Sequence, residues 1–418
     1  MNSRTHENAQ HDIVSVLPDR AHDLARLREL ATRGEPIVTV IGKYNHGKSR
    51  LLNELVGRDI FAVADKRETV ELSEWLHQGV RWLDAPGLDA DVGTEDDRHA
   101  LRAAWLKSDI RLFVHTAKEG ELDAKELALL EELRADGLRT RRQILFVLSQ
   151  IDQLADEGEL GKVRAAINAQ AVTTAVHAVS ATRHRQGIES AKNMLVERSG
   201  IPSLRTLLET MLGLVPDART HEARLLSGEI REELEQLHAR QQQTLESLRR
   251  NQVQQRQSFD DGLDAVLHKV GRDIKEVVDA PVADHAVVAD TAQDKYNITQ
   301  AKLERARIQI AYSRACIQID SFLTGYGVVG LPKEQQVAAG SLNTVMVAVM
   351  GVSVKFRSDL RSWFCEAPGH ARMQREFTHY FERSKDREAL REKIAGTESA
   401  LAATQRALAA LCAMETGA

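Results

Sequence analysis

The sequence predicts an α/β domain with a mainly parallel sheet and helices on both faces, followed by an all-α helical bundle or stalk. Short apolar runs alternate with helix signals between residues 36 and 214, which is typical of such a sheet. A glycine-rich loop separates the first apolar run from the first helix of that region. From residue 218 to 280 proline is absent and leucines recur at helical spacing, which predicts long helices.

The chain is therefore expected to have three parts. These are an N-terminal tail and helix at 1–35, the α/β domain at 36–214, and a helical region at 215–418 with an apolar tip around 325–364.

The N-terminal part opens with polar residues, and 1–12 are expected to be disordered. A helix is expected at 18–33, because Pro18 stands at its start, Gly34 follows its end and leucines recur at intervals of three.

In the α/β domain, apolar runs predict strands and amphipathic runs predict helices. The expected strands are 37–41, 71–76, 80–83, 110–115, 144–148 and 174–179. The expected helices are 50–56, 123–133 and 203–212. The second and third strands flank His77-Gln78-Gly79, which predicts a tight hairpin.

The helical region contains three long amphipathic segments, at about 218–280, 291–322 and 372–412. The first is expected to form one or two helices with a coiled-coil-like seam. Polar residues at 249–257 weaken that seam and are expected to mark a bend. Three such segments predict an antiparallel bundle or stalk.

The segment 325–364 is glycine-rich and unusually apolar, and its centre reads LNTVMVAVMGVSV. It is too short to span a bilayer, which takes about 20 apolar residues. Two interpretations stay open: an interior element at the tip of the bundle, or a contact with a membrane surface. Basic residues follow the apolar centre, as would suit anionic headgroups.

Composition narrows the class of protein. Of the 418 residues 43% are hydrophobic, and the formal net charge is −5, which argues against a general nucleic-acid binder, so no DNA partner is expected. The cysteines Cys316, Cys365 and Cys412 lie far apart, so neither a disulfide nor a cysteine zinc site is predicted. No secretory signal is recognised. A cytoplasmic protein is expected, with a peripheral membrane location as an alternative.

Residues 42–49 read GKYNHGKS between an apolar run and a helix, which is the arrangement of a P-loop. Gly42 and Gly47 let several backbone N–H groups point at one phosphate, and the following helix adds its positive end. Lys48 is expected to reach the outer phosphates, and the Ser49 hydroxyl is expected to bind Mg²⁺.

The sequence DAPG begins at Asp84, 35 residues after Ser49, at the end of a predicted strand. A carboxylate there can bind Mg²⁺, usually through water, and Gly87 can offer its backbone N–H to a γ-phosphate.

The sequence SQID, with Ser149, Gln150 and Asp152, follows the strand at 144–148. The Asp152 carboxylate can accept two hydrogen bonds from guanine, a pair that adenine cannot offer. Ser180 and Ala181 end the last strand, where a backbone N–H can bind the guanine oxygen.

Together these motifs resemble the five nucleotide-binding motifs of the Era-like and dynamin-like P-loop GTPases of the TrmE-Era superfamily. The segment NHGKSRLLNELVG is similar to that family's usual run after the P-loop. The match covers about residues 36–214. The layout of the remaining chain resembles bacterial dynamin-like proteins of the LeoA type, without a motif that can be quoted.

The resemblance implies GTP and GDP as ligands, Mg²⁺ as cofactor and GTP hydrolysis as activity. It implies Ser49, Thr69 and Asp84 at Mg²⁺, with Thr69 as the threonine that closes on the metal and Gly87 in the second switch. The implied nucleotide-binding positions are Gly42, Asn45, His46, Gly47, Lys48, Ser49, Arg50, Ser149, Gln150, Asp152, Ser180 and Ala181.

Asn45 matches an asparagine that helps hold K⁺ near the phosphates in some family members, where the cation supplies positive charge in the transition state. The alternative is an asparagine that a loop simply tolerates. Leu88 stands where small signalling GTPases place a water-positioning glutamine. Hydrolysis is therefore expected to be slow and to depend on a cation, a second copy of the domain, or both.

Three functions stay open. The first is a GTP-driven mechanoenzyme that dimerises through the α/β domain and moves a helical stalk at a membrane. The second is an Era-like regulatory GTPase acting on a ribosome, RNA or protein. The third is a scaffold that binds nucleotide and barely hydrolyses it.

Overall fold

The computed structural model describes residues 3–32, 34–61, 73–84, 106–171, 175–281, 283–338 and 340–416. The chain divides into two compact units. The first unit is Met1–Gln236 with Arg406–Ala418, and the second unit is Leu237–Gln405.

The first unit contains a six-stranded sheet with the order β2-β3-β1-β4-β5-β6. Its strands are β1 (Ile37–Ile41), β2 (Ser73–His77), β3 (Val80–Asp84), β4 (Ile110–Thr116), β5 (Gln143–Ser149) and β6 (Val176–Ala178). All neighbours pair in parallel except β2 and β3. The carboxyl ends of β1, β3, β4, β5 and β6 therefore meet at one edge of the sheet.

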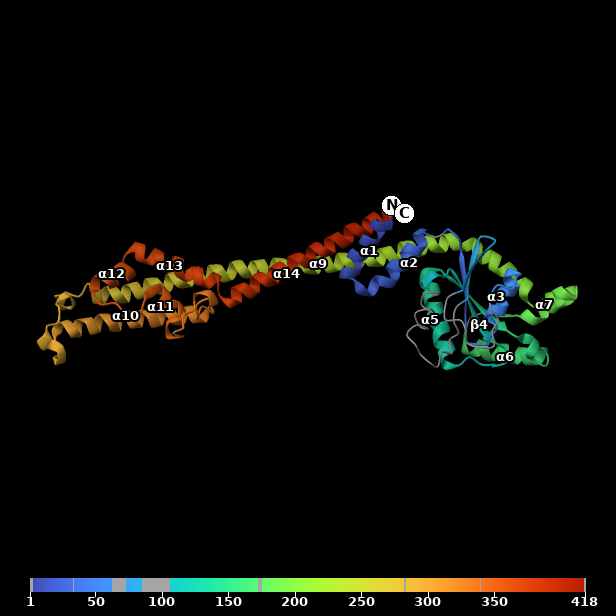
Figure 1. Cartoon of the computed structure of the whole chain (residues 1–418), viewed down its shortest axis with the longest axis horizontal. Helices are drawn as coiled ribbons and strands as arrows, with labels where there is room; N and C mark the ends of the chain where they lie inside the picture. Colours follow the sequence, from blue (N-terminus) through green and yellow to red (C-terminus); the bar gives the residue numbers. More distant parts are fainter. Residues whose placement is uncertain are drawn as a thin grey trace. The chain divides into compact units, whose positions relative to one another are not determined.

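Helices cover both faces of the sheet (Figure 1). One face packs on α3 (Lys48–Val56) and on the first turns of α9 (Ile201–Val278). The other face packs on α5 (Ala124–Thr140) and α6 (Glu157–Gln170). Every residue of β4 is buried, as expected of a central strand covered on both sides. The predicted fold class is thus confirmed, with α7 (Ala181–Glu189) and α8 (Asn193–Arg198) after the last strand.

The predicted hairpin is present between β2 and β3, with His77 paired to Val80. Gln78 and Gly79 form its turn with φ angles of 49° and 73°. Two residues with positive φ make the turn whose twist matches that of the strands.

The prediction of a disordered N-terminus is wrong. Residues Ser3–Val16 form helix α1, which is anchored by buried Ala9 and Ile13. These two buried side chains, four residues apart, hold a mostly polar helix in place, because helices in proteins are stabilised mainly by tertiary packing. The helix expected at 18–33 is confirmed as a 3₁₀ turn at Pro18–Arg20 followed by α2 (Ala21–Thr32).

Helix α9 is one continuous helix of 78 residues and contains Pro216. It runs through the boundary that the sequence predicts at 214/215, because the buried Val215 side chain packs in the core on the sheet. A helix accepts a proline at the cost of one backbone hydrogen bond and a kink. The compact units divide later, between Gln236 and Leu237.

The second unit is all helical. It contains the later part of α9 and most of α14 (Lys385–Thr416), with α10 (Gln300–Gly325), α11 (Val345–Met350), α12 (Arg357–Phe364) and α13 (Ala367–Glu382). Phe259 of α9 stacks on Phe381 of α13, with ring centroids 4.1 Å apart. The two expected helical segments after α9 are present, although the second is divided into α13 and α14.

The apolar centre of the segment 325–364 lies inside the second unit. Its apolar side chains Val345, Met346, Val349 and Met350 are buried in the core of the second unit. The Tyr312 hydroxyl of α10 donates to the Met350 carbonyl oxygen at 2.8 Å. The structure thus agrees with the interior alternative, because the apolar face of α11 packs in the same core as residues of α9 and α10. Of the helices in the described residues, none has the length and apolar character needed to cross a bilayer.

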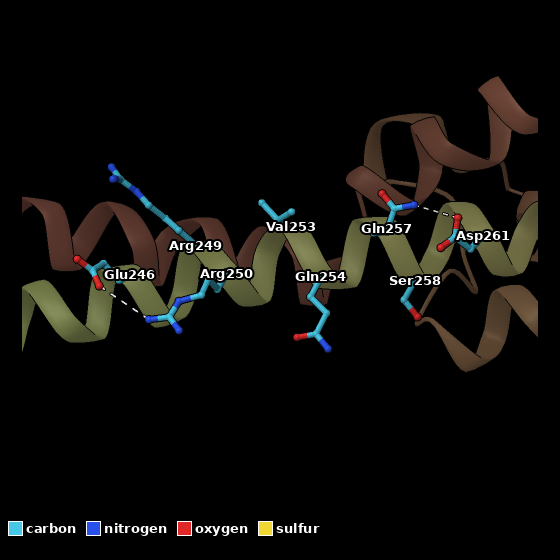
Figure 2. Close-up of a pocket in the computed structure, with 8 residues that line it drawn as sticks. All are labelled: Glu246, Arg249, Arg250, Val253, Gln254, Gln257, Ser258 and Asp261. Carbon is cyan, nitrogen blue, oxygen red and sulfur yellow. Dashed lines mark hydrogen bonds and ion pairs between the residues drawn. The ribbon is translucent and has the colours of Figure 1, made fainter.

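The polar stretch at 249–257 does not interrupt α9 (Figure 2). Of the α9 side chains between Leu245 and Phe259, all of which the structure describes, none is buried. Some of them, together with Asp261, line an open groove of about 1110 Å³. Arginine and glutamine are good helix formers, so the helix persists where the apolar seam is lost.

Candidate nucleotide-binding site

The sequence motifs meet at the carboxyl edge of the parallel strands. Residues 42–47 form the loop between β1 and α3, Asp84 is the last residue of β3, and Ser149 is the last residue of β5. In open parallel sheets this edge is where ligands bind.

At two positions of the loop, the backbone geometry explains why the residue is glycine. A Cβ on Gly42 would stand 2.1 Å from the Val114 carbonyl oxygen of β4, so only glycine fits there. Gly47 has a φ of +79° and is the N-cap of α3, a backbone conformation that glycine adopts at little cost. Asn45 also has a positive φ, 58°, which asparagine tolerates better than most residues.

Lys48 is the first residue of α3, and its ammonium donates to the Lys43 carbonyl oxygen at 2.7 Å. The side chain therefore folds over the loop that leads to the helix. The N-terminal N–H groups of α3 point to the same place and favour an anion there.

Ser49 and Asp84 are brought together across the sheet edge. The Ser49 Oγ donates to Asp84 Oδ2 at 2.5 Å. The second oxygen of the buried carboxylate, Oδ1, has no hydrogen-bond partner among the described residues. Burial raises the pKa of the Asp84 carboxyl, against the opposing effects of Ser49 and Lys48.

A hydroxyl and a carboxylate with an unused oxygen are the hard oxygen donors that Mg²⁺ prefers. These residues therefore fit the metal that the sequence predicts. Thr69 and Gly87, together with Leu88, lie outside the described residues.

Asp152 and Ser180 also meet, although 28 positions separate them. The Ser180 Oγ donates to Asp152 Oδ1 at 2.5 Å and accepts the Arg183 backbone N–H at 2.9 Å. Ser180 is thus the N-cap of α7, which begins at Ala181. This pair fixes the direction of the carboxylate that the sequence assigns to guanine.

The sequence did not predict how Ser149 and Gln150 act on the P-loop. The Ser149 hydroxyl donates to the His46 carbonyl oxygen, and the Gln150 side-chain amide donates to the Asn45 carbonyl oxygen, each at 2.6 Å. Gln150 has a φ of 57°. The phosphate loop and the loop after β5 are therefore tied together by two hydrogen bonds.

His46 and Lys43 turn away from the expected phosphate position. The His46 imidazole is buried and contacts the Val114 carbonyl oxygen and the Glu119 carboxylate. Burial lowers the pKa of His46, against the opposing effect of Glu119. Lys43 forms ion pairs with Glu119, Asp123 and Glu126. These acidic partners carry no sequence motif, so the sequence could not identify them.

Two predicted positions of the loop and helix start face solvent. Asn45 and Arg50 are exposed.

Comparison with known proteins gives matches over most of the chain and matches over the sheet domain alone. Residues 37–150 match the family model described as 50S ribosome-binding GTPase. The chain is 50% identical over 407 residues to protein ACIAD1443 of Acinetobacter baylyi, described as uncharacterized, and the match covers 97% of both chains. It is 32% identical over 131 residues to GTPase Der of Clostridium perfringens, which is 29% of each chain.

Among solved structures, the chain is similar to the LeoA bacterial dynamin GTPase from ETEC, with 12% identity and a TM-score of 0.36 over 99% of this chain and 93% of the other. It is similar to a structure described as an oligomerised bacterial dynamin pair, with 12% identity and a TM-score of 0.39 over 94% and 91% of the two chains.

Proposed function

Because the chain belongs to the same family as the Acinetobacter baylyi protein and is a GTP-binding P-loop GTPase of the Era class in its sheet domain, we propose that it hydrolyses GTP with Mg²⁺. The observation that best supports this is the Ser49–Asp84 pair, whose second carboxylate oxygen has no hydrogen-bond partner among the described residues. GTP hydrolysis consists mainly of positioning and of charge stabilisation. A preformed pair of oxygen donors beside the phosphate loop meets that need.

The residue roles are part of the proposal. Lys48 and the N–H groups of residues 42–49 hold the β- and γ-phosphates, and Ser49, Asp84 and Thr69 hold Mg²⁺. When bound there, Mg²⁺ would neutralise the negative charge that develops on the β- and γ-phosphate oxygens. Asn45 holds K⁺ at the same place, and Gly87 donates its backbone N–H to the γ-phosphate.

Base selection is assigned to the loops after β5 and β6. Asp152 accepts from guanine, and Ser180 holds that carboxylate in place through the 2.5 Å hydrogen bond. Ala181 supplies a backbone N–H at the start of α7, and Gln150 packs beside the phosphate loop that it already contacts.

We further propose that two copies pair through their GTPase domains and that α9 carries the resulting change into the helical region. Support comes from the continuity of α9. Ile201, Leu204 and Leu208 pack on the sheet in the first unit, and the same helix ends at Val278 in the second. A rigid helix is a direct mechanical link between two units.

The target of the helical region is proposed to be a membrane surface, as the resemblance to dynamin-like proteins implies. The description of the matching family model, a ribosome-binding GTPase, favours the Era-like regulatory function as the second candidate.

One assay tests hydrolysis and pairing together. The GTPase rate per molecule is measured against protein concentration, with and without anionic liposomes. The rate per molecule is expected to increase with protein concentration, and liposomes should increase it further. Lys48→Ala should abolish turnover, whereas Lys162→Ala, on the exposed surface of α6, should match the unchanged protein.

A constant rate would contradict pairing and leave a GTPase that acts as a single molecule. Comigration with ribosomes, without any effect of liposomes, would favour the regulatory function. Turnover that Lys48→Ala leaves unchanged would refute hydrolysis at this site.

A further inference from the structure

Two buried histidines lie directly behind the phosphate loop. His46 belongs to the loop and His115 to β4, and their side chains are 1% and 0% exposed. Their rings meet edge to face with centroids 5.2 Å apart. Together with Glu119, they offer three ligand atoms that all lie within 4.8 Å of one another. We call these three residues the His46 cluster.

Both ring nitrogens of His46 face hydrogen-bond acceptors. Nδ1 lies 3.2 Å from the Val114 carbonyl oxygen, and Nε2 lies 3.1 Å from Glu119 Oε1. A neutral imidazole carries only one N–H. Whichever nitrogen carries it, the other nitrogen presents a lone pair to an oxygen, and that lone pair is available to a metal ion.

His115 repeats this arrangement. Its Nδ1 lies 2.8 Å from Glu126 Oε1, and its Nε2 lies 3.3 Å from the Gly120 carbonyl oxygen. A histidine that donates one N–H to a carboxylate and offers its other nitrogen is the usual orientation of a metal ligand. Glu126 is itself held by the Asp123 backbone N–H at 3.2 Å.

Three carboxylates lie at or near the cluster. Glu119, Asp123 and Glu126 each form an ion pair with the Lys43 ammonium. This concentration of acidic groups attracts a cation to the two imidazoles.

From this arrangement we propose that the His46 cluster is a binding site for a divalent transition metal of the Zn²⁺ class. One ring nitrogen of His46, one of His115 and the Glu119 carboxylate are its protein ligands, and water takes the fourth position of a tetrahedral site. Two imidazoles and a carboxylate suit Zn²⁺ better than Mg²⁺, which prefers oxygen ligands only.

Glu119 makes the site accessible. Its side chain is 45% exposed, so it can turn to close on a metal that enters from solvent. Zn²⁺ bonds of about 2.0–2.2 Å require the three ligand atoms to draw together, and the exposed carboxylate has the room to move. The site is separate from the Mg²⁺ site, but it shares the loop residue His46 with the phosphate loop.

The test is calorimetric titration of the nucleotide-free full chain with zinc chloride, in excess Mg²⁺ so that sites made only of carboxylates are filled. Binding of one Zn²⁺ is expected. Glu119→Gln and His115→Gln should each weaken it by at least about tenfold. Glu121→Gln, two residues along the same loop and also exposed, should bind as the unchanged protein does.

The proposal is overturned if the unchanged chain binds no Zn²⁺ in a one-to-one complex. It is equally overturned if Glu119→Gln binds Zn²⁺ as tightly as Glu121→Gln, since the metal would then lie on other histidines. His115 is buried and its replacement can impair folding. The comparison of the two exposed variants Glu119→Gln and Glu121→Gln therefore decides whether Glu119 is a ligand. The measurement is of Zn²⁺ binding and does not depend on GTPase activity.

Discussion

At the scale of single residues, the nucleotide site contains residues that are adjacent in sequence and residues that only the fold brings into contact. Gly42, Gly47 and Lys48 follow one another in a loop whose pattern alone predicts a phosphate cradle. The Ser180–Asp152 hydrogen bond was not predicted, although both residues were assigned to guanine. Gln150 was assigned to the nucleotide, and its hydrogen bond to the Asn45 carbonyl oxygen gives it a structural role as well.

The residues around His46 could not be identified from sequence. Their partners come from β4, from the loop after it and from the start of α5, and none belongs to a recognisable motif. A side chain of the phosphate loop that turns inward depends on the residues of the neighbouring strand, which a single sequence does not reveal.

Asp152→Asn tests base selection. An amide at this position can accept only with its oxygen, and its NH₂ group faces the guanine donors. Since hydrogen bonds to a charged group contribute about 1.5–3 kcal/mol, the affinity for GTP should fall roughly ten- to hundredfold, with little change for ATP. Competition binding measures both. An unchanged preference for GTP over ATP would remove Asp152 from the guanine site.

Asn45 gives a second prediction at this scale. If Asn45 holds K⁺ beside the phosphates, the turnover of GTP should be faster in KCl than in NaCl at equal ionic strength. Asn45→Ala should remove that difference. Equal rates of the unchanged protein in both salts would exclude a K⁺ role for Asn45.

At the scale of elements, the most informative feature is a set of buried ion pairs that joins helices α2 and α9 to the residues directly before strands β4 and β5. Arg26 of α2 and Arg142, between α5 and β5, both contact Glu222 of α9. Arg26 and Arg219 contact Asp109, directly before β4. These charges are far apart in sequence and have no pattern, whereas β1, β4 and β5 were predicted because each is a short apolar run.

Helices without a long apolar face were the elements that sequence patterns missed. In α6, Ile167 is the one buried residue of the helix. Helix α1 was taken for a disordered tail because its sequence is mostly polar. The apolar segment 325–364 was found from its composition, and its apolar centre is buried in the core of the second unit. Composition alone left two alternatives open, because it does not say which core an apolar helix fills.

Glu222→Gln tests the buried ion pairs. The neutral amide removes the buried carboxylate that Arg26 and Arg142 share, and the loss of one partner of a buried ion pair typically costs about 3–5 kcal/mol. The melting temperature of the full chain should fall by several degrees. The control is Glu229→Gln on the same helix, whose pairs with Arg20 and Arg139 are partly exposed and contribute about 0–1 kcal/mol. Equal melting temperatures for the two variants would contradict a stabilising role of the buried pairs.

These pairs also predict a loss of stability in acid. Burial alone would raise the pKa of the Glu222 carboxyl, but Arg142 and Arg26 lower it overall. Arg219 and Arg26 lower the pKa of Asp109 in the same way against burial. A carboxyl with a lowered pKa stabilises the fold at pH values above its unfolded pKa of about 4 and loses that contribution as the pH falls further.

The melting temperature should therefore decrease as the pH is lowered below about 4, and by less in Glu222→Gln than in the unchanged chain. The same decrease in both proteins would show that Glu222 does not contribute to it.

At the scale of the whole molecule, the long helix α9 runs from the GTPase domain of the first unit into the helical second unit, and α14 also has residues in both units. The class of each part was predictable, because apolar periods of different length mark parallel strands and long helices. The division between them was not, since α9 continues from the sheet through Pro216 into the second unit. Continuity of that helix is what makes a nucleotide-controlled movement of the helical region a physical possibility.

The central claim is that the edge formed by the P-loop, Asp84 and Asp152 binds GTP with Mg²⁺. A crystal structure of the chain with a non-hydrolysable GTP analogue and Mg²⁺ tests it most directly. The account predicts the phosphates within residues 42–49, Mg²⁺ beside the Ser49 hydroxyl and the guanine hydrogen-bonded to Asp152. Analogue bound elsewhere, or this pocket left empty at saturating analogue, would contradict it.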